Sequence, residues 1–595
     1  MATAQSFRTH TCGELRPEHV GQRVTLAGWV HRRRDHGHLS FFDLRDRYGI
    51  TQVVTSADEA PAAHQAAAES RNEWVIQVSG AVRHRPEGTT NVELPTGEVE
   101  VAVDELTVLN ESKVPPFYVN EEQPGLEEAL RLQYRYLDLR RPPMRERMLL
   151  RARLASAVRR ELERDDFVEI ETPLLIRSTP EGARDFVVPA RLQPGNFYAL
   201  PQSPQQLKQL LMVAGYDRYY QMAHCMRDED SRKDRGPEFT QVDIEMSFVR
   251  EEDVIATVEA MVIAVSREVV PDRPIQEAPF PRLTYEEALV RYGSDKPDLR
   301  FGMPLCDLGE AVANVEFRVF ADALSGGGAV YAIRAPGCAS YSRRQLEELT
   351  DLAKRHGAGG LVHLSVEADG LRGPAAKFLG GAEASVRAAT GAEAGDLLLV
   401  VADSDRVAAA MALGQLRLEM GDRLGLRDPS VLAYVWVHRF PMFKWDRDLG
   451  RWDATHNPFS APVWEEAEQM EADPGSIHAQ QYDLALNGWE LGGGSIRIHR
   501  RDLLERAFAL MGHTIAGMRD QFGALLDALE YGAPPHGGIA IGLERWCALL
   551  ANQDNIREVT AFPKTQSGSD LMLSAPSPID DQQLADLHLR VNLED

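Results

Sequence analysis

Three arginines from distant parts of the chain have surroundings that suit the binding of phosphate or carboxylate groups. Arg227 lies in a charged segment between two strand-like runs, Arg497 follows a run of three glycines, and Arg545 precedes an apolar helical run. A guanidinium group binds phosphate and carboxylate through two parallel hydrogen bonds, which the ammonium group of lysine does not do. The three positions therefore predict a site that holds both a triphosphate and an amino acid.

Two carboxylates upstream of Arg497 are candidate magnesium ligands. Asp483 and Glu490 lie on either side of Asn487-Gly488, a dipeptide typical of tight β-hairpin turns. Magnesium binds a few carboxylates together with phosphate oxygens, so the pair suits a triphosphate site. A salt bridge explains either carboxylate taken alone, and this alternative stays open.

The segment 239–248 alternates apolar and polar residues in a way that predicts a β-strand. One face would carry Val242, Ile244, Met246 and Phe248, and the other Gln241, Asp243, Glu245 and Ser247. An ordinary half-buried strand with a solvated polar face fits this pattern as well. The charged loop before it, which contains Arg227, favours a strand and loop that frame a nucleotide.

A helix is expected to begin shortly after residue 200. Ser203 suits its N-cap, with Pro204 at the first helical position. Lys208 would then project about one turn into the helix. Capping explains Ser203 but not the other residues of this segment.

Length and composition indicate a globular protein of several domains. The chain has 595 residues, of which 44% are hydrophobic and 26% charged. No apolar run is long enough to span a membrane, and the N-terminus lacks a signal-peptide pattern. The five cysteines are scattered, which suits neither a zinc site nor a disulfide framework. We therefore expect a cytoplasmic protein without a membrane partner.

The order of strand-like and helical runs predicts a multidomain α+β protein. Five strand-like runs near the N-terminus suit a small closed barrel, of which the oligonucleotide-binding (OB) fold is one kind. An alanine- and glycine-rich stretch farther along the chain is interpreted as an inserted domain. The expected parts are the barrel, a connector, a first catalytic part, the insertion, a second catalytic part and a C-terminal extension, over residues 1–110, 111–145, 146–285, 286–430, 431–562 and 563–595.

The charge distribution leaves a nucleic-acid partner open. The net charge of −25 argues against one, but phosphate binding depends on local basic patches. Arg32, Arg33 and Arg34 form such a patch near the N-terminus. A solvated run of charges is the simpler interpretation of these three residues alone.

Together these segments resemble the class II aminoacyl-tRNA synthetases, and in particular the bacterial-type aspartyl-tRNA synthetases. Residues 167–173 are similar to motif 1 of this class, whose proline lies at the homodimer interface. Residues 227–229 with 239–248 are similar to motif 2, and residues 542–545 to the end of motif 3. Residues 178–185 are similar to the family's mobile loop over the amino acid. The resemblance covers nearly the whole chain.

The resemblance implies a homodimeric aspartate–tRNA ligase that uses ATP and Mg²⁺. It would convert L-aspartate to aspartyl-adenylate and transfer the aspartyl group to the 3′ end of tRNA-Asp. The implied fold has an N-terminal OB-fold barrel that binds the anticodon. A class II catalytic domain built on an antiparallel sheet with flanking helices would follow, interrupted by an inserted α/β domain of the bacterial type.

The family's functional positions can be carried over to this chain. Arg227 would hold the α-phosphate and Arg545 the γ-phosphate, while Glu490 and Asp483 would hold magnesium. The ATP-binding positions are Arg227, Asp228, Glu229, Glu490, Gly542, Leu543, Glu544 and Arg545. The aspartate-binding positions are Glu181, Ser203, Gln205, Lys208, Arg227, Asp243, His456 and Arg497. The positions expected to contact anticodon bases are Arg34, His36, Phe41 and Gln52. Without the resemblance, Phe41 would be interpreted as a core residue.

Three positions depart from the family pattern. Asn457 follows His456 where the family often has a second histidine, and Gly236 stands where a glutamine often contacts ATP. His36 stands where strictly aspartate-specific enzymes tend to carry leucine. Histidine there is similar to enzymes that also aspartylate tRNA-Asn, which makes a non-discriminating enzyme the main alternative.

More distant alternatives are a synthetase for asparagine or lysine and a non-catalytic paralogue that binds tRNA. Lys208 and Arg497 facing the substrate argue against lysine, and the large insertion favours the bacterial aspartyl type. A non-catalytic paralogue would be expected to lose its ATP-binding arginines, yet Arg227 and Arg545 are both present.

Overall fold

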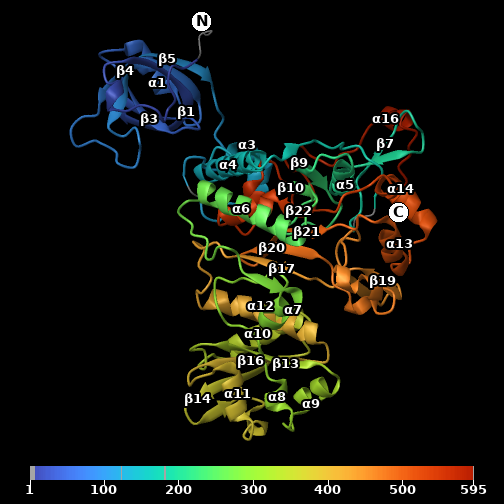
Figure 1. Cartoon of the computed structure of the whole chain (residues 1–595). Helices are drawn as coiled ribbons and strands as arrows, with labels where there is room; N and C mark the ends of the chain where they lie inside the picture. Colours follow the sequence, from blue (N-terminus) through green and yellow to red (C-terminus); the bar gives the residue numbers. More distant parts are fainter. Residues whose placement is uncertain (1–6, 122, 180–181, 594–595) are drawn as a thin grey trace. The chain divides into compact units, whose positions relative to one another are not determined.

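The computed structural model describes residues 7–121, 123–179 and 182–593, and Figure 1 labels its helices and strands. The chain divides into two compact units, which are described separately. The first comprises Met1–Leu149, Thr560–Thr565 and Ser569–Ser577, and the second Leu150–Val559, Gln566–Gly568 and Pro578–Asp595. Within the described ranges no helix is long and apolar enough to cross a membrane.

The first unit contains a closed five-stranded barrel with the strand order β1-β2-β3-β5-β4. Alternate residues fill its interior; Leu26, Phe42 and Val53, for example, are fully buried. The prediction of an N-terminal barrel is confirmed. Its elements are β1 (Arg23–His36), β2 (Leu39–Arg45), β3 (Ile50–Ser56), α1 (Pro61–Glu69), β4 (Val75–His84) and β5 (Val99–Asn110).

The connector after the barrel belongs to the same unit and is attached by a buried ion pair. It contains α2 (Glu128–Gln133) and α3 (Arg135–Asp138). Arg45 of β2 donates two hydrogen bonds of 2.9 Å to the carboxylate of Glu73, and both side chains are buried. Arg140 binds the same carboxylate at 3.2 Å. A buried carboxylate requires such partners, so these contacts tie the connector to the barrel.

The second unit is built on an eight-stranded sheet with the order β11-β17-β20-β21-β22-β10-β9-β6. All neighbouring strands are antiparallel except the outer pairs β11–β17 and β6–β9. The prediction of a mainly antiparallel catalytic sheet is confirmed. The strands are β6 (Val168–Glu169), β9 (Arg218–Met226), β10 (Glu238–Ser247), β11 (Arg282–Thr284), β17 (Tyr434–His438), β20 (Gln481–Leu486), β21 (Trp489–Ile496) and β22 (His536–Gly542).

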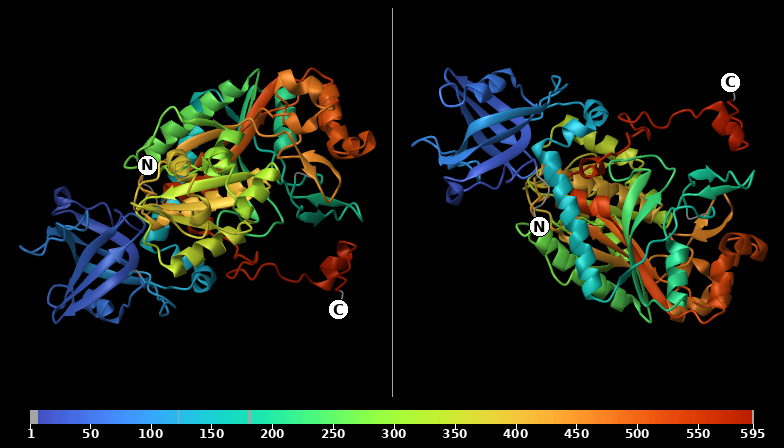
Figure 2. Two further views of the ribbon diagram at one scale, coloured as in Figure 1. Left: turned by 90° about the horizontal axis from the view of Figure 1, so that it is seen from below. Right: turned by 90° about the horizontal axis from the view of Figure 1, so that it is seen from above.

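The two faces of this sheet differ. Helices α4 (Pro142–Arg164) and α6 (Glu251–Val269) lie side by side along it, in cyan and green in the right-hand view of Figure 2. Their apolar residues share one core with Val242 and Ile244 of β10. Helix α5 (Gln205–Val213) contacts β10 through Lys208 and Asp243, on the polar side of the strand. The apolar face therefore provides the core, and the polar face is available for a site.

The alternation predicted for residues 239–248 holds with one exception. Val242, Ile244 and Met246 are buried in the core as expected. Phe248 was wrongly assigned to that face: β10 ends at Ser247, and Phe248 has a φ of 58° and is 72% exposed. The polar face is not solvated either, since Asp243 and Glu245 are fully buried.

Several further helices and short strands complete the catalytic part. The β20–β21 hairpin turns at Asn487 and Gly488, both with positive φ, as the dipeptide predicted. The remaining elements are β7 (Val187–Pro189), β8 (Phe197–Ala199), α7 (Tyr285–Tyr292), β18 (Phe443–Asp446), β19 (Arg451–Ala454), α13 (Arg501–Leu510), α14 (Ile515–Leu529), α15 (Leu543–Leu550) and α16 (Asp581–Asp586).

The inserted segment folds as a three-layer α/β domain, shown below α7 in Figure 1. Its sheet has the order β12-β13-β16-β14-β15. Helices α10 and α12 pack on one face of the sheet, and α8, α9 and α11 pack on the other. The elements are β12 (Cys306–Asp307), α8 (Gly309–Val312), α9 (Arg318–Ser325), β13 (Ala329–Ala335), α10 (Arg343–Arg355), β14 (Val362–Glu367), β15 (Gly370–Arg372), α11 (Glu383–Thr390), β16 (Leu397–Asp403) and α12 (Arg406–Arg423).

Glycines in β21 and β22 allow the central strands to approach closely. A Cβ atom on Gly538 would lie 1.9 Å from the carbonyl oxygen of Ile244 on β10. One on Gly493 would lie 2.7 Å from Asp483 Oδ1 on β20. The glycine-rich composition of these strands is thus a packing requirement of the sheet.

We predict that Gly538→Ala strongly destabilises the catalytic part. The new methyl group would collide with backbone, and overpacking of this kind costs about 1–3 kcal/mol or more. A clear drop in the midpoint of thermal unfolding, measured by calorimetry, is expected. Gly523→Ala in α14 is the matched control, because no atom lies within 4 Å of its added methyl. Equal midpoints for the two variants would contradict the packing argument.

Candidate active site

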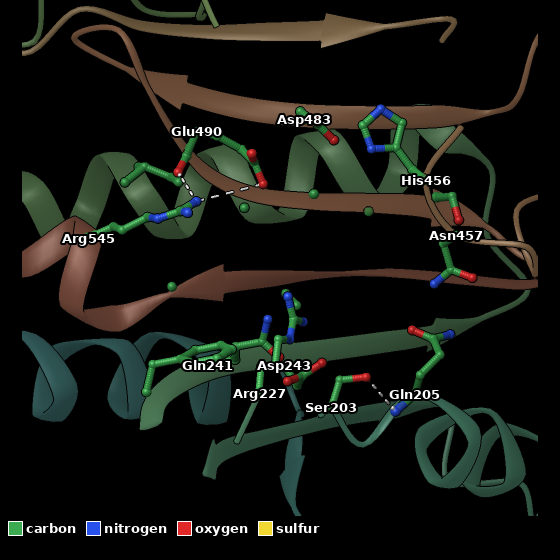
Figure 3. Close-up of a pocket in the computed structure, with 18 of the residues that line it drawn as sticks. Ser203, Gln205, Arg227, Gln241, Asp243, His456, Asn457, Asp483, Glu490 and Arg545 are labelled. Carbon is green, nitrogen blue, oxygen red and sulfur yellow. Dashed lines mark hydrogen bonds and ion pairs between the residues drawn. The ribbon is translucent and has the colours of Figure 1, made fainter. Parts of the chain in front are cut away.

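A cavity of about 360 Å³ lies over the polar face of the sheet (Figure 3). Strands β10, β20, β21 and β22 form its floor, and α5, the loop after β9 and the segment around His456 form its sides. The structure thus brings together predicted residues separated by more than 300 positions. The predicted residues that line the cavity are Ser203, Gln205, Lys208, Arg227, Glu229, Asp243, His456, Asp483, Glu490, Arg497, Gly542, Glu544 and Arg545.

Two predicted residues within the described ranges, Asp228 and Leu543, are not part of this lining. Asp228 forms an ion pair of 2.8 Å with Arg184, and Leu543 is buried in the core. Glu181 lies outside the described residues. Glu544 lines the cavity but is engaged by the fold, because its carboxylate accepts hydrogen bonds from Arg151 and from the backbone of Thr240.

Two arginines line the cavity, Arg545 beside Glu490 and Arg227 nearer to Asp243 (Figure 3). Arg227 lies with its guanidinium carbon 5.1 Å from the ring centroid of Phe239, a cation–π contact. Arg545 donates to Asp234 and to the carbonyl oxygen of Glu490 at 3.0–3.2 Å, and its Nη1 lies 3.8 Å from Glu490 Oε1. These contacts hold the guanidinium groups of Arg227 and Arg545 on opposite walls of the cavity (Figure 3). A chain of phosphate groups could bind between the two guanidinium groups.

Asp483 and Glu490 form an acidic pair beside Arg545. They lie on the adjacent strands β20 and β21, and a β-bulge at Leu484–Ala485 shifts the register between them. Burial raises the pKa of Asp483 well above its ordinary range, and the carboxylate of Glu490 raises it further. The pair therefore favours a positively charged partner.

A network of four buried charged side chains adjoins the cavity, and three of them, Lys208, Asp243 and Arg497, line it. Lys208 Nζ donates to Asp243 Oδ1 at 2.9 Å and lies 3.4 Å from Glu245 Oε2. Arg497 binds both carboxylate oxygens of Glu245, at 3.0 and 3.2 Å, and donates to Ser495 Oγ at 2.7 Å. Two cations and two carboxylates balance one another in an environment that excludes water.

The two carboxylates of this network have different capacities for further partners. Burial raises the pKa of Asp243, and Lys208 offsets this only in part. Burial would also raise the pKa of Glu245, but the charges of Arg497 and Lys208 outweigh it and lower the pKa. Within the described part of the chain, Asp243 Oδ2 is buried and has no hydrogen-bond partner. Asp243 can therefore accept another donor, whereas Glu245 is committed to Arg497.

Helix α5 begins one residue later than predicted. Its N-cap position is Pro204 and its first residue is Gln205. Ser203 Oγ still accepts a hydrogen bond from the backbone nitrogen of Gln205, at 3.3 Å. The shift occurs because Pro204 has a ψ of 23°, outside the helical region. Lys208 consequently lies in the first turn of the helix, facing β10.

His456 and Asn457 lie on the side of the cavity opposite Gln205 (Figure 3). Burial lowers the pKa of His456, although nearby carboxylates, foremost Glu490, oppose the shift. Asn457 Oδ1 accepts a hydrogen bond from the backbone nitrogen of Phe459 at 2.9 Å. This bond directs the amide nitrogen of Asn457 to the opposite side, toward the cavity.

Several lining residues were not identified from the sequence. Phe239 and Gln241 were assigned only to a strand, and Asp234 only to a charged loop, yet all three line the cavity. Glu245 was named only as part of a polar face. Its position two residues after Asp243 on the same face was the signal that it belongs to the same network.

The four predicted residues of the barrel lie near one another: Arg34 and His36 are exposed, Phe41 is partly buried and Gln52 is buried. Arg34 Nη2 donates to Gln52 Oε1 at 3.1 Å, and Arg34 is paired with Phe41 across β1 and β2. The rings of His36 and Phe41 meet edge to face, with centroids 5.7 Å apart. Phe41 is only partly buried, whereas the neighbouring Phe42 fills the barrel core. The alternative interpretation of Phe41 as a core residue is thus not supported.

Glu100 is a buried partner of Gln52 that the sequence did not reveal. It accepts a hydrogen bond from Gln52 Nε2 at 2.7 Å and one from Arg83 Nε at 2.8 Å. Glu100 lies on β5, far from Arg34 in the chain, and is almost fully buried. Only the closure of the barrel brings it beside β3.

Comparison with known proteins agrees with these observations. Residues 127–566 match the family of class II tRNA synthetases (D, K and N), and residues 24–109 match the OB-fold nucleic acid binding domain. Because the first match covers most of the chain, the protein belongs to the class II tRNA synthetases of this group.

Relatives at higher identity define the family within this class. The chain is 55% identical to the aspartate–tRNA(Asp/Asn) ligase of Moorella thermoacetica, over 98% of this chain and 96% of that protein. It is 51% identical to the enzyme of the same name from Heliobacterium modesticaldum, again over 98% and 96%. The chain belongs to the family of these ligases.

Solved structures support the fold. The asparaginyl-tRNA synthetase of Pyrococcus horikoshii with asparaginyl-adenylate superposes with a TM-score of 0.59 at 20% identity, covering 93% of this chain and 98% of that one. The aspartyl-tRNA synthetase of Entamoeba histolytica gives a TM-score of 0.55 at 18% identity, covering 92% and 89%. At these identities the comparison concerns the fold alone.

We predict that removing one partner of the Arg497–Glu245 pair destabilises the protein. Glu245→Met leaves Arg497 buried without its countercharge, a loss that typically costs about 3–5 kcal/mol. The urea midpoint of the transition of the catalytic part, followed by tryptophan fluorescence, should fall clearly. The double variant Glu245→Met/Arg497→Met removes both charges and should recover much of the loss. A double variant less stable than the single one would contradict this account.

Proposed function

We propose that this chain is an aspartate–tRNA ligase that activates L-aspartate with ATP and transfers it to the 3′ end of tRNA. One observation carries the proposal: a single cavity is lined by Arg227 and Arg545 and also by the buried pair of Lys208 and Arg497. The first two side chains suit a triphosphate, and the buried pair suits a substrate with a side-chain carboxylate. The relatives named aspartate–tRNA(Asp/Asn) ligase support the same function.

The part of the cavity around Lys208 and Arg497 would recognise aspartate by the charged groups of that amino acid. Lys208 and Arg497 would receive the side-chain carboxylate. The unpartnered Oδ2 of Asp243 would accept a hydrogen bond from the substrate ammonium. Ser203, Gln205 and His456, which also line the cavity, would complete the contacts, and Glu181 is carried over from the family as a further contact. Asparagine would replace the charge-assisted hydrogen bonds of the side-chain carboxylate with bonds of a neutral amide and would bind less well, by about 1.5–3 kcal/mol for each bond lost.

The part of the cavity around Arg227 and Arg545 would hold ATP for an in-line displacement. Arg227 would bind the α-phosphate and Arg545 the γ-phosphate, with the adenine near Phe239. An oxygen of the aspartate α-carboxylate would attack the α-phosphorus, and the bond to the bridging oxygen would break to release pyrophosphate. The terminal ribose hydroxyl of tRNA would then attack the acyl carbon, and AMP would leave. The protein supplies positioning and charge neutralisation, without a nucleophile of its own.

Asp483 and Glu490 are the residues that would hold Mg²⁺. Within the described ranges no group of three or more histidine, cysteine, aspartate or glutamate residues could hold a metal ion. Two carboxylates suit magnesium that is also bound by phosphate oxygens, so the donor set fits an ion that arrives with ATP. When bound, the ion would neutralise charge on the phosphates.

The barrel would bind the anticodon of tRNA. Arg34 and Gln52 offer hydrogen-bonding groups beside the partly exposed ring of Phe41, a combination suited to single-stranded RNA. His36 packs against Phe41 and so lies where it would influence a stacked base. Together with the names of the relatives, this position favours an enzyme that aspartylates tRNA-Asn as well as tRNA-Asp.

We further infer a homodimer and a cytoplasmic location. The similarity of residues 167–173 to motif 1 supports the homodimer. None of the five cysteines, all of which lie within the described ranges, forms a disulfide, which suits a reducing compartment.

We predict that Arg227→Lys nearly abolishes activation of aspartate. Lysine keeps the charge but loses the bidentate fork, and loss of one such group typically lowers kcat by about 10²–10³-fold. The measurement is aspartate-dependent exchange of pyrophosphate into ATP. Arg318→Lys, at an exposed pair with Asp322, is the control and should retain activity. Full activity of Arg227→Lys would refute its proposed role.

We predict that the protein charges both tRNA-Asp and tRNA-Asn with labelled aspartate. His36→Leu should lower charging of tRNA-Asn by about tenfold and leave tRNA-Asp nearly unchanged, since one contact to a stacked base is worth about 1–3 kcal/mol. His38→Leu, an exposed position on the same hairpin, is the matched control. Charging of tRNA-Asp alone by the unaltered protein would make it a discriminating enzyme.

A further inference from the structure

Beneath the part of the cavity that would hold the amino acid, a chain of hydrogen bonds joins Gln205 to the start of β22. Gln205 and Gln209 lie one turn apart on α5, and Gln205 Nε2 donates to Gln209 Oε1 at 3.1 Å. Gln209 Nε2 lies 3.1 Å from Nε2 of His536, whose Nδ1 lies 2.8 Å from the carbonyl oxygen of Pro534. Gln209 and His536 are almost fully buried and do not line the cavity.

The direction of every hydrogen bond in this chain is determined by its far end. The carbonyl oxygen of Pro534 can only accept, so Nδ1 of His536 carries a proton. Burial lowers the pKa of His536; Glu245 opposes this shift, while Arg497 and His499 reinforce it. The imidazole is therefore neutral, and its Nε2 is an acceptor.

The neutral imidazole then orients both amides. Gln209 must donate its nitrogen to His536, so its oxygen faces Gln205. That oxygen accepts the nitrogen of Gln205, and the oxygen of Gln205 is left facing the cavity. Figure 3 shows this oxygen turned toward the interior of the cavity and the nitrogen turned away. Among the described residues no hydrogen bond to Gln205 Oε1 is present.

Gln205 Oε1, a neutral acceptor, and Asp243 Oδ2, a carboxylate acceptor, therefore accept no hydrogen bond from any described residue. The residues Gln205 and Asp243 both line the part of the cavity that would hold the amino acid, and Asp243 Oδ2 itself is buried beneath that lining. An ammonium group offers three donors and no acceptor, so it matches this pair. A reversed amide at Gln205 would instead present its own N–H groups to the ammonium.

We propose that Gln209 and His536 are positioning residues that hold the oxygen of Gln205 toward the substrate ammonium group. The proposal rests on the proposed function, since it concerns the same amino-acid site. Neither residue would touch the substrate; they act by excluding the reversed orientation of the Gln205 amide. The relay therefore contributes to the binding of any amino acid, whereas Lys208 and Arg497 select its side chain.

Two substitutions of Gln209 separate this role from simple packing. Gln209→Met is uncharged and of similar shape, but it can no longer accept from Gln205. Gln209→Glu introduces a charge but keeps an oxygen for Gln205 Nε2, and its other oxygen can accept from His536 after protonation of Nε2. The positioning role predicts that Gln209→Met raises the KM for aspartate more than Gln209→Glu does. A packing role predicts the opposite order.

The experiment is amino-acid-dependent pyrophosphate exchange with full-length protein, measuring KM for aspartate and for ATP. Gln209→Met should raise the KM for aspartate by about tenfold or more, the effect expected for one hydrogen bond to a charged group, with the KM for ATP within about twofold. Gln209→Glu should keep the KM for aspartate within about threefold. Thermal unfolding checks that both variants fold.

A double-variant cycle tests the connection to His536. His536→Leu should raise the KM for aspartate as Gln209→Met does. The double variant should raise this KM no more than either single variant, because both substitutions interrupt the same series of hydrogen bonds. Additive effects, or a KM for aspartate that rises more in Gln209→Glu than in Gln209→Met, would overturn the relay.

The outcomes also separate this inference from the proposed function. Exchange driven by another amino acid would overturn aspartate as the substrate, but the ranking of the two Gln209 variants toward that amino acid would still decide the relay. Aspartate-dependent exchange with equal KM values in all variants would overturn the relay alone. Absence of any exchange in the unaltered protein would overturn both.

Discussion

The bidentate pair between Arg497 and Glu245 is the contact on which the arrangement of the cavity depends. Glu245 comes from β10 and Arg497 follows β21, so the pair spans β22 between them. It holds a guanidinium group in a buried position where an unpaired charge would be prohibitively unfavourable. With Lys208 and Asp243 beside it, the floor of the cavity is neutral as a whole but strongly charged locally. Such a floor is prepared for a zwitterionic, acidic substrate without reorganisation.

The two faces of the sheet have different roles: one face packs into the core, and the other face carries the charged residues at the cavity. On β10, Val242 and Ile244 enter the main core, while Asp243, one residue away, lines the cavity and Glu245 joins the buried ion pairs beside it. Close strand spacing at Gly493 and Gly538 keeps these faces in register. Because adjacent residues of a strand point to opposite sides, a shift of one residue would bury the charges in the core and expose the apolar residues. The strand register therefore determines both the packing of the core and the position of the charged residues at the cavity.

Much of the fold followed from local patterns. The barrel strands and the turn at Asn487-Gly488 were indicated by strand-like runs and turn residues. The resemblance to a known family directed attention to nearly all the charged lining residues. It did not reveal that Asp228 forms an ion pair with Arg184, or that Phe248 lies beyond the end of β10. Both outcomes depend on where the chain turns, which weak local preferences do not determine.

The amino-acid sequence by itself determined the kinds of groups available: guanidinium forks, an acidic pair beside a hairpin turn, and a strand with two distinct faces. Only the tertiary structure decided which of them meet. Glu245 becomes the partner of Arg497, Glu100 joins Gln52, and His536 orients amides on a helix more than 300 residues away. The reason is physical: hydrogen-bond direction and charge pairing act over a few ångströms, and the distances between these residues are set by sheet order and barrel closure, not by separation along the chain.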